Sequence, residues 1–281
     1  PRCDGFLGAS NMTNRTIGAV EILHSGEESY KNIWQKVRSI WAYVYDHYVD
    51  DFDFFYINGD NAYVVAENLI HLCQSLPVDT PVYTGHAIAL PQRGDKYCGG
   101  GGGYMMNRVA LKLFVGRYFE RESCLPRYVG SDEDRSTGRC MERNGIMCMH
   151  SADEFGQSRF HPMSAEYHSR WVRVNGSPWM HKYLVRDYNL TSPSKECLDS
   201  ISASSVSFHL FRDEEDLQKR GPSKSRDEGI RRYHAILNDL CPDHRRSSFM
   251  EIVHPQKGSD LCGFKNFTKS SVNKSNDAAS S

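Results

Sequence analysis

Apolar residues along the first part of the chain switch between helical and strand-like spacing. In residues 29–48 the large apolar side chains fall on one face at helical spacing, which predicts an amphipathic helix. The short apolar run at residues 54–57 predicts a buried strand, and helical spacing returns at residues 63–72, just after the candidate N-cap Asn61. Residues 81–85 predict a further strand. Strands that alternate with helices indicate an α/β sandwich with a mainly parallel sheet.

A glycine-rich interruption separates these elements from the next ones. The run CGGGGGY at residues 98–104 cannot form regular structure, and Asn107 behind it is placed to cap a helix. Gly145 is placed to end a later helix. The predicted elements here are helices at residues 109–114 and 132–144 and strands at residues 146–150 and 205–211.

The character of the sequence changes in its last third. Residues 1–211 carry the alternating pattern and are predicted to form one domain. Residues 212–264 begin as a charged stretch and include a helical pattern at residues 230–240, which predicts a helical extension. Residues 265–281 are rich in Ser, Asn and Lys with few apolar side chains, so a disordered tail is predicted.

Composition and charge narrow the function classes. The 281 residues are 39% hydrophobic, which is enough for a sizeable core. The formal charge of −1 and the sequence pI of about 7.0 provide no overall field that would attract nucleic acid. No apolar run reaches the roughly 20 residues of a membrane-spanning helix, and nothing near Pro1 resembles a signal peptide. The sequence begins without Met, so we expect it to be part of a longer parent that carries any membrane anchor.

Nine cysteines and several glycosylation motifs favour an oxidising compartment. The cysteines are scattered with no CxxC pair, which argues against a zinc ribbon or a thioredoxin-like site. Asn-X-Ser/Thr motifs start at Asn11, Asn14, Asn175, Asn189, Asn266 and Asn273. Cysteines beside such motifs favour the secretory pathway, although cysteines can also be buried hydrophobic residues and short motifs arise by chance.

The predicted strand at residues 54–57 ends in a small polar elbow, Asn58-Gly59-Asp60-Asn61. An enzyme that breaks a bond to a diphosphate benefits from a cation at a strand end, because Mn²⁺ or Mg²⁺ neutralises the charge that grows on the leaving group. Asp60 offers a carboxylate ligand, Asn61 offers a weaker neutral oxygen, and Gly59 offers none. Considered alone, the stretch is more often a turn than a metal site.

Three further features have both a functional and an ordinary interpretation. The glycine run lets backbone N–H groups approach phosphate or sugar oxygens, yet it lacks the P-loop and dinucleotide-binding patterns and can be only a flexible loop. Glu133 and Asp134 at a predicted helix start can supply a base for a sugar hydroxyl, or only favourable helix-dipole charges. His209, in the apolar stretch VSFHLF, can reach a metal through one ring nitrogen or be an ordinary core residue.

Taken in order, five blocks of the sequence resemble the inverting β1,3-glycosyltransferase family. The blocks are WAYVYDHYVDDFDFFYINGDNAYVVAENLIHL, YCGGGGGYMMNRVALKLF, SDEDRSTGRCMERNGI, RFHPM and VSFHLF. The likeness covers about residues 3–211 and is strongest to the core 1 β1,3-galactosyltransferase branch. The first block and GRCMERNGI are its most specific parts.

The resemblance implies a GT-A fold, in which a Rossmann-like α/β sheet holds a UDP-sugar and Mn²⁺ or Mg²⁺ at its strand ends. The likeness begins partway into that fold, so its first strand is expected to be absent from this sequence. The family's Asp-X-Asp motif falls on Gly59-Asp60-Asn61, where only the middle acid is kept. The expected metal ligands are therefore Asp60, Asn61 and His209.

The resemblance also assigns roles to residues of the other blocks. Asp134 is the expected catalytic base that deprotonates the acceptor hydroxyl. The expected donor- and acceptor-binding residues are Gly101, Gly102, Gly103 and Glu133, with Trp171 and Trp179 as candidates to stack on the acceptor. Core packing is the equally supported role for the two tryptophans. Cys124 and Cys140 occupy the positions of the family's disulfide partners.

The implied reaction is inverting transfer of galactose from UDP-galactose to the 3-hydroxyl of N-acetylgalactosamine on Ser or Thr of a glycoprotein. The implied setting is the Golgi lumen, with a type II membrane protein as the full-length parent, a homodimer as one assembly to consider, and no nucleic-acid partner. N-acetylglucosamine and glucuronic acid are alternative donor sugars on this scaffold.

The reduced acidic motif leaves a second hypothesis open. A catalytically silent relative could act as a chaperone or partner of a glycosyltransferase. Retention of the Glu133-Asp134 pair, the glycine run and His209 favours the enzyme, because a pure binder has no chemical need for all three.

Overall fold

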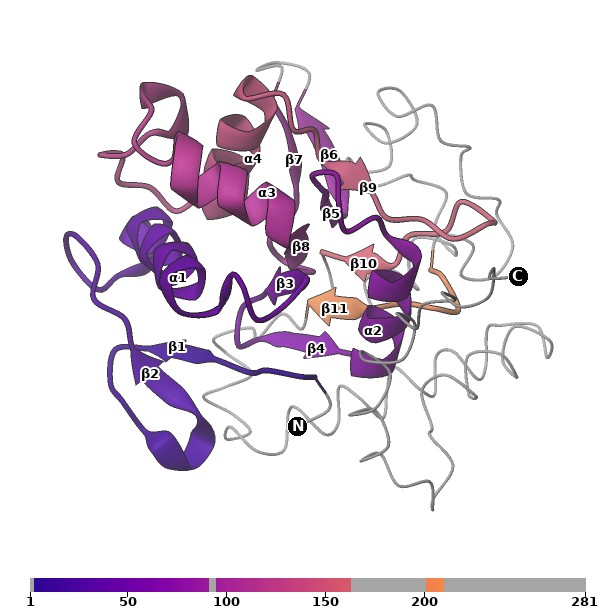
Figure 1. The fold of residues 1–281 in the computed structure, drawn as a ribbon, viewed down its shortest axis with the longest axis horizontal. Coiled ribbons are helices and arrows are strands. Elements are labelled where there is room, and N and C mark those ends of the chain that lie inside the picture. Colours follow the sequence, from indigo (N-terminus) through magenta and orange to yellow (C-terminus); the bar gives the residue numbers. More distant parts are fainter. Residues whose placement is uncertain (1–2, 91–94, 163–200, 210–281) are drawn as a thin grey trace, which may run out of the picture.

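The structure is a computed structural model that describes residues 3–90, 95–162 and 201–209. In this part of the chain, helices cover both faces of a central sheet, and a small two-stranded unit stands beside them (Figure 1). The prediction of an α/β architecture is thus confirmed, whereas its closer description as a Rossmann-like GT-A fold stays a prediction. Among the described residues, no helix is long and apolar enough to cross a membrane.

The helical segments carry the predicted helices and several short turns. They are η1 (Arg15–Ile17), η2 (Tyr30–Asn32), α1 (Ile33–Tyr48), α2 (Ala66–Ser75), α3 (Arg108–Leu113), the π-helical turn η3 (Phe114–Tyr118), η4 (Glu122–Cys124) and α4 (Glu133–Arg143). Asn107 caps α3 as predicted, because its side chain accepts the N–H of Ala110 at 2.9 Å. Gly145 follows α4 with φ of 85°, a conformation that favours glycine.

The strands are mostly short. They are β1 (Gly8–Ser10), β2 (Ala19–Glu21), β3 (Phe54–Ile57), β4 (Ala62–Val64), β5 (Tyr83–Gly85), β6 (Ala87–Leu90), β7 (Asp95–Cys98), β8 (Tyr104–Asn107), β9 (Met149–His150), β10 (Phe160–His161) and β11 (Ser207–His209). The predicted strands 54–57, 81–85, 146–150 and 205–211 correspond to β3, β5, β9 and β11. Residues 210 and 211 lie outside the described part.

The central sheet has the strand order β3-β8-β5-β9 and separates two apolar cores. Alternate side chains of a strand point to opposite faces. Accordingly Tyr104 and Met106 of β8 join the core formed with α1, α3 and α4, whereas Met105 joins Leu69 and Leu72 of α2. Both cores consist of side chains that are almost fully buried, which is the three-layer arrangement visible in Figure 1.

The expectation of a mainly parallel sheet was wrong. β8 runs antiparallel to both of its neighbours, β3 and β5, and only the β5–β9 pair of this sheet is parallel. A parallel connection needs a long crossover, usually a helix. The chain instead passes from β5 to β8 through the antiparallel β6–β7 hairpin and a tight turn, so β8 returns in the opposite direction.

The predicted helix at residues 63–72 also needs correction at its start. Residues 62–64 form β4, which pairs antiparallel with β11, and α2 begins only at Ala66. Strand pairing to a segment far along the sequence therefore overrides the helical spacing of Tyr63 and Val64. β11 pairs in turn with β10, which gives a second sheet of order β10-β11-β4.

Two disulfides stabilise this part of the chain. Cys124–Cys140 joins η4 to α4 and confirms the predicted pair. Cys98–Cys148, which the sequence analysis did not identify, joins the end of β7 to the residue before β9. Trp171, Trp179, the segment 212–264 and the tail 265–281 lie outside the described residues, so the predictions for them stay predictions.

Candidate functional site

The glycine run forms a tight turn between β7 and β8. Gly99 enters the turn with its N–H bonded to the carbonyl of His86 at 2.8 Å, and the N–H of Gly103 closes it on the carbonyl of Gly100 at 2.8 Å. Gly103 has φ of 74°, a conformation that other residues rarely adopt. The run is therefore a defined turn and not a free loop.

On one side, the glycine turn contacts the acid pair at the start of α4. The N–H of Gly100 donates to Oδ2 of Asp134 at 2.8 Å, and the N–H of Arg135 donates to Oδ1 at 2.7 Å. A side chain at Gly100 would meet Oε1 of Glu133 and would lie 3.1 Å from Cβ of Asp134. The absence of a side chain thus lets the turn backbone bond directly to the predicted base.

The placement of the acid pair depends on close packing of α4 against β7. At Gly138 the helix comes so near that an added Cβ would lie 2.7 Å from Cα of Tyr97. The Cys124–Cys140 disulfide holds the same helix from its other neighbour, η4. The first turn of α4, with Glu133 and Asp134, is therefore fixed beside the entry to the glycine turn.

Burial and mutual repulsion change the acidity of this pair. Burial and the neighbouring Asp134 raise the pKa of Glu133 to about 8, although the Tyr104 hydroxyl donates to its Oε2 at 2.9 Å. Burial also raises the pKa of Asp134, while the N–H groups of Gly100 and Arg135 oppose that shift. Glu133 is therefore protonated near neutral pH, and Asp134 has a higher proton affinity than an exposed Asp.

On its other side, the glycine turn contacts His209 of β11. A Cβ at Gly101 would lie 2.8 Å from Nδ1 of His209 and 2.8 Å from the carbonyl oxygen of Pro162. The His209 Nδ1–H donates to that carbonyl at 3.1 Å, which assigns the lone pair of the ring to Nε2. Burial lowers the pKa of His209, so the imidazole is neutral at physiological pH.

The middle of the turn is held by two hydroxyl groups. The carbonyl of Gly102 accepts hydrogen bonds from the Tyr56 hydroxyl at 2.7 Å and from Oγ of Ser207. These two residues belong to β3 and β11, which lie in different sheets. The glycine turn is therefore fixed to both sheets at Gly102, directly after the residues that contact the acid pair and His209.

The turn brings three distant parts of the sequence to one place. Asp134 contacts Gly100 and His209 contacts Gly101, and consecutive Cα atoms are about 3.8 Å apart. The predicted base and the predicted metal ligand therefore lie on the order of 10 Å apart, on neighbouring residues of one backbone turn.

The polar elbow after β3 is an exposed turn. The N–H of Ala62 bonds to the carbonyl of Gly59 at 3.2 Å, which leaves Asp60 and Asn61 at the tip. Ala62 is the direct cross-strand partner of His209. The elbow is therefore a turn, as its composition suggests, and it is also adjacent to the strand position of the predicted imidazole ligand.

These residues fit a divalent cation in their chemistry. A His that ligates a metal usually donates its other ring N–H to a carbonyl or carboxylate, and His209 does so to Pro162. Asp60 supplies the hard anionic oxygen and Asn61 a neutral one. Among residues 3–90, 95–162 and 201–209, no three His, Cys, Asp or Glu side chains gather around a common metal position, so Asp60 and His209 have no third ligand of these types.

Several residues of the site were not found from the sequence. Tyr56, Tyr104 and Ser207 hold the turn and the acid pair, yet their spacing in the sequence is that of ordinary strand residues. The Cys98–Cys148 disulfide anchors the turn at its entry. The sequence signal for it was only the position of Cys98 directly before the glycine run.

The chain is similar in sequence to known glycosyltransferases. The chain is 28% identical over 214 residues to glycoprotein-N-acetylgalactosamine 3-beta-galactosyltransferase 1 of Xenopus laevis, and the match covers 76% of this chain and 56% of that protein. It is 29% identical over 130 residues to chondroitin sulfate synthase 3 of Homo sapiens, which covers 42% of this chain and 14% of the relative.

A third relative is chondroitin sulfate glucuronyltransferase of Homo sapiens, 26% identical over 152 residues, or 53% of this chain and 19% of that protein. The chain thus spans about half the length of the galactosyltransferase and less of the other two. No protein-family model matches the chain. These similarities confirm the resemblance to a β1,3-galactosyltransferase that the sequence blocks indicated.

Proposed function

We propose that this chain is the catalytic domain of an inverting β1,3-galactosyltransferase. Its donor is UDP-galactose and its acceptor is the 3-hydroxyl of N-acetylgalactosamine on Ser or Thr of a glycoprotein. The observation that carries the proposal is the glycine turn, because Gly100 contacts Asp134 and the next residue contacts His209. The similarity to a galactosyltransferase that acts on glycoprotein N-acetylgalactosamine supports the same reaction.

Asp134 is the base of the proposed mechanism. The N–H groups of Gly100 and Arg135 occupy one lone-pair direction on each of its oxygens, and a carboxylate has further lone pairs that can accept a hydroxyl proton. Its raised pKa makes it a stronger base than an exposed Asp. The activated 3-hydroxyl attacks the anomeric carbon from the face opposite UDP, which inverts its configuration.

Glu133 positions the acceptor beside this base. Because its pKa is raised to about 8, the carboxyl carries a proton near neutral pH and does not repel the negative charge of the Asp134 carboxylate. The Tyr104 hydroxyl fixes the orientation of the carboxyl. In this protonated form Glu133 can donate a hydrogen bond to a sugar oxygen.

The donor lies along the other half of the glycine turn. The proposed donor-binding residues are Gly101, Gly102 and Gly103, of which Gly101 is partly exposed, whereas Gly102 and Gly103 are buried against His161 and Tyr56. Asp60, Asn61 and His209 are the residues that would hold Mn²⁺ or Mg²⁺. Such a cation, when bound, neutralises charge on the departing diphosphate.

The proposed setting follows from the reaction and from the disulfides. Two disulfides in the described residues suit an oxidising lumen, and a Golgi membrane protein is the proposed parent. A homodimer is the assembly to examine first. The proposed partners are UDP-galactose and a glycoprotein that carries N-acetylgalactosamine, with no nucleic acid.

The experiment is transfer of galactose from UDP-galactose to a peptide carrying N-acetylgalactosamine, followed by mass spectrometry with Mn²⁺ present or chelated. Asp134→Asn should lower kcat by at least a factor of about 100, because general-base catalysis contributes that much or more. Asp50→Asn, at an exposed acid that pairs with Lys112, is the matched control and should keep full activity.

Two results would contradict the proposal. One is turnover that Asp134→Asn leaves at the level of the Asp50 variant. The other is a folded wild-type chain that forms no product with any UDP-sugar tested. That result would favour a catalytically silent relative that binds another glycosyltransferase, in which Asp60 is the only acid of the elbow.

A further inference from the structure

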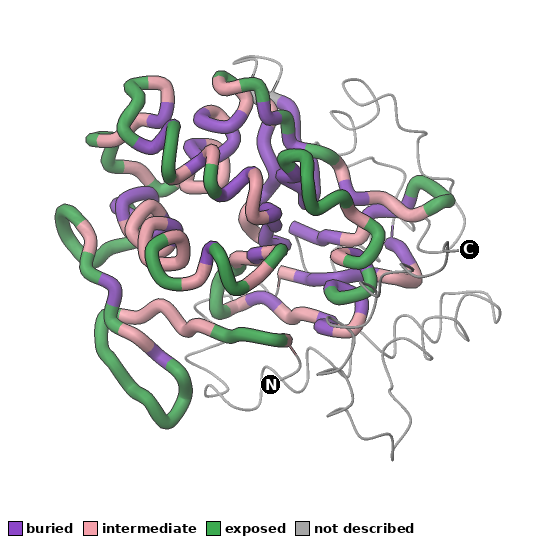
Figure 2. Tube along the Cα trace, in the orientation of Figure 1, coloured by how far each residue is buried: buried purple, intermediate pink, exposed green. Residues whose placement is uncertain are grey.

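The β1–β2 unit carries two adjacent acceptor motifs for N-linked glycans. The sequence NMTNRT at residues 11–16 contains Asn11-Met12-Thr13 and Asn14-Arg15-Thr16. It forms the connection from β1 to β2, and every residue from 11 to 18 is exposed. Figure 2 shows this connection as a continuous exposed stretch that projects from the body of the molecule. Both motifs are thus accessible in the folded chain.

The two asparagines differ in how firmly the turn holds them. The side chain of Asn14 accepts the N–H of Thr16 at 3.1 Å, and its backbone exchanges two hydrogen bonds of 2.9 Å with Ala19. Asn14 therefore closes the turn through both its side-chain oxygen and its backbone. Asn11 lies at the preceding bend, where its Oδ1 has only a 3.5 Å contact from Ser10.

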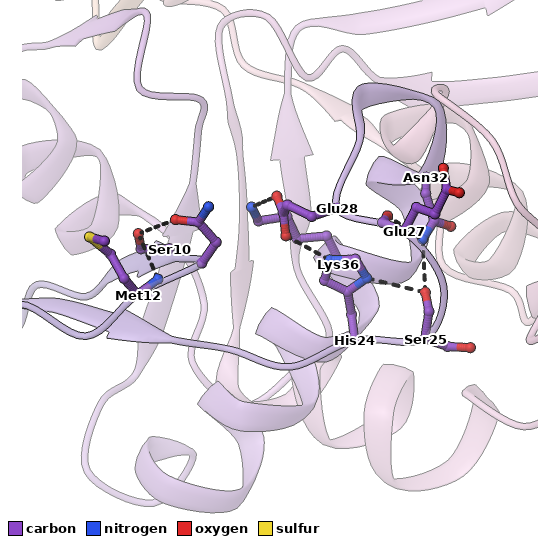
Figure 3. Close-up of polar contacts among 9 residues, drawn as sticks. Ser10, Met12, His24, Ser25, Glu27, Glu28, Asn32 and Lys36 are labelled. Atoms are coloured by element: carbon purple, nitrogen blue, oxygen red, sulfur yellow. Dashed lines mark hydrogen bonds and ion pairs between the residues drawn. The ribbon is translucent and has the colours of Figure 1, made fainter.

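The backbone around Asn11 is nevertheless well defined. Oγ of Ser10 accepts the N–H of Met12 at 3.3 Å (Figure 3). Further along, Glu28 bonds both Lys36 of α1 and His24, the latter at 2.8 Å, so the segment leaving β2 is fixed to α1. The bend at Asn11 is thus presented on an ordered unit.

Exposed apolar side chains lie along the β1–β2 unit and its connection. Phe6, Met12 and Ile17 have exposed fractions of 75%, 62% and 66%. The ring of Phe6 lies against Gly18, where an added Cβ would be 3.6 Å from Cδ1 of the ring. Clustered apolar side chains on a surface promote association unless something covers them. An N-linked glycan is bulky and solubilising, and so is suited to that task.

We infer that Asn11 carries an N-linked glycan, which covers the apolar surface of the β1–β2 unit. The inference rests on the lumenal setting of the proposed function. Nδ2 of Asn11 forms a bond to the anomeric carbon of a lipid-diphosphate-linked oligosaccharide. The bond from that carbon to the diphosphate oxygen breaks, the amide loses one proton, and the lipid diphosphate leaves. In Figure 1 the β1–β2 unit lies apart from the β7–β8 turn, so the glycan leaves the candidate site open.

The test is glycosylation mapping of the chain secreted from cultured animal cells. Trypsin releases a peptide from Cys3 to Arg15 that contains both asparagines. A peptide N-glycosidase in heavy-oxygen water converts each glycosylated Asn to a labelled Asp, and fragment ions locate the label. The expected result is label at Asn11. An unlabelled Asn11, or label at Asn14 alone, would overturn the inference.

Variants give a second readout on intact protein. Asn11→Gln should lose the mass of one glycan, and Asn14→Gln should lose none. Thr13→Ser keeps a hydroxyl in the motif and should keep the glycan, whereas Thr13→Ala should lose it. Because the wild-type mapping needs no variant to fold and measures no transfer of galactose, its result is separate from the outcome of the transferase assay.

Discussion

Glu133 and Asp134 are adjacent acids whose environments separate their roles. Tyr104 orients the first, and backbone N–H groups hold the second. Burial raises the pKa of both. These contacts distinguish a proposed positioning group from a proposed base, whereas the sequence alone could only indicate two acids at a helix start.

The raised pKa of Glu133 predicts a pH dependence of stability. The folded chain keeps this proton up to about pH 8, whereas the unfolded chain releases it near pH 4.5. The free energy of unfolding of wild type relative to Glu133→Gln should therefore decrease as pH rises between these values, and become constant above about pH 8. The slope cannot exceed about 1.4 kcal/mol per pH unit for one proton.

Denaturant titrations at several pH values measure this difference. Glu120→Gln is the control, since its side chain is 85% exposed. A wild-type curve parallel to that of Glu133→Gln across the whole range would show that Glu133 is not held in its protonated form.

At the scale of elements, the features that depend on residues close together in the sequence could be predicted. The helical spacing of residues 33–48, the Asn107 cap and Gly145 after α4 are all read from neighbours in the sequence. β4 and β8 were not, because the pairing of Ala62 with His209 and of Ile57 with Tyr104 depends on residues far away in the chain. The polar elbow could likewise be identified in the sequence, but its nearness to His209 could not be predicted.

Packing of α4 on β7 gives a prediction for Gly138→Ala. In an isolated helix Ala is favoured over Gly by about 1 kcal/mol. Here the added Cβ meets the backbone of Tyr97, which cannot move aside, so the variant should instead lose about 1–3 kcal/mol of stability. It should also lower transferase activity, because α4 carries Asp134.

Gly116→Ala provides the matched control for thermal unfolding and activity. The Cβ added there would be 2.7 Å from the hydroxyl of Tyr45, the far end of a flexible side chain. A Gly138→Ala variant as stable as wild type would show that α4 and β7 are not in such close contact.

At the scale of the whole molecule, the two disulfides should contribute unequally. Cys98–Cys148 closes a loop of 50 residues and Cys124–Cys140 one of 16. The chain-entropy relation gives about 4 and about 3 kcal/mol for these lengths. The double variant Cys98→Ala/Cys148→Ala should therefore have a lower Tm than Cys124→Ala/Cys140→Ala, as measured by calorimetry. The reverse order would show that the longer loop is already ordered in the unfolded chain.

The α/β layering and the Cys124–Cys140 pair were predictable for the whole molecule, the first from alternating patterns and the second from resemblance. The Cys98–Cys148 pair was not, since nine scattered cysteines allow many pairings and only the folded chain brings β7 beside β9. The meeting of Asp134 and His209 on one glycine turn likewise depends on three sequence blocks that only the fold assembles.

The central claim is that this glycine turn forms one pocket for a nucleotide-diphosphate sugar. A crystal structure of the chain with UDP and Mn²⁺ tests it most directly. The account predicts that the diphosphate lies beside Gly101–Gly103 and that Asp60 and His209 bind the cation. It also predicts that the phosphate farther from the ribose, to which the sugar would be attached, faces Asp134 across an open space. UDP bound away from the β7–β8 turn, or a cation held by none of these residues, would contradict the account.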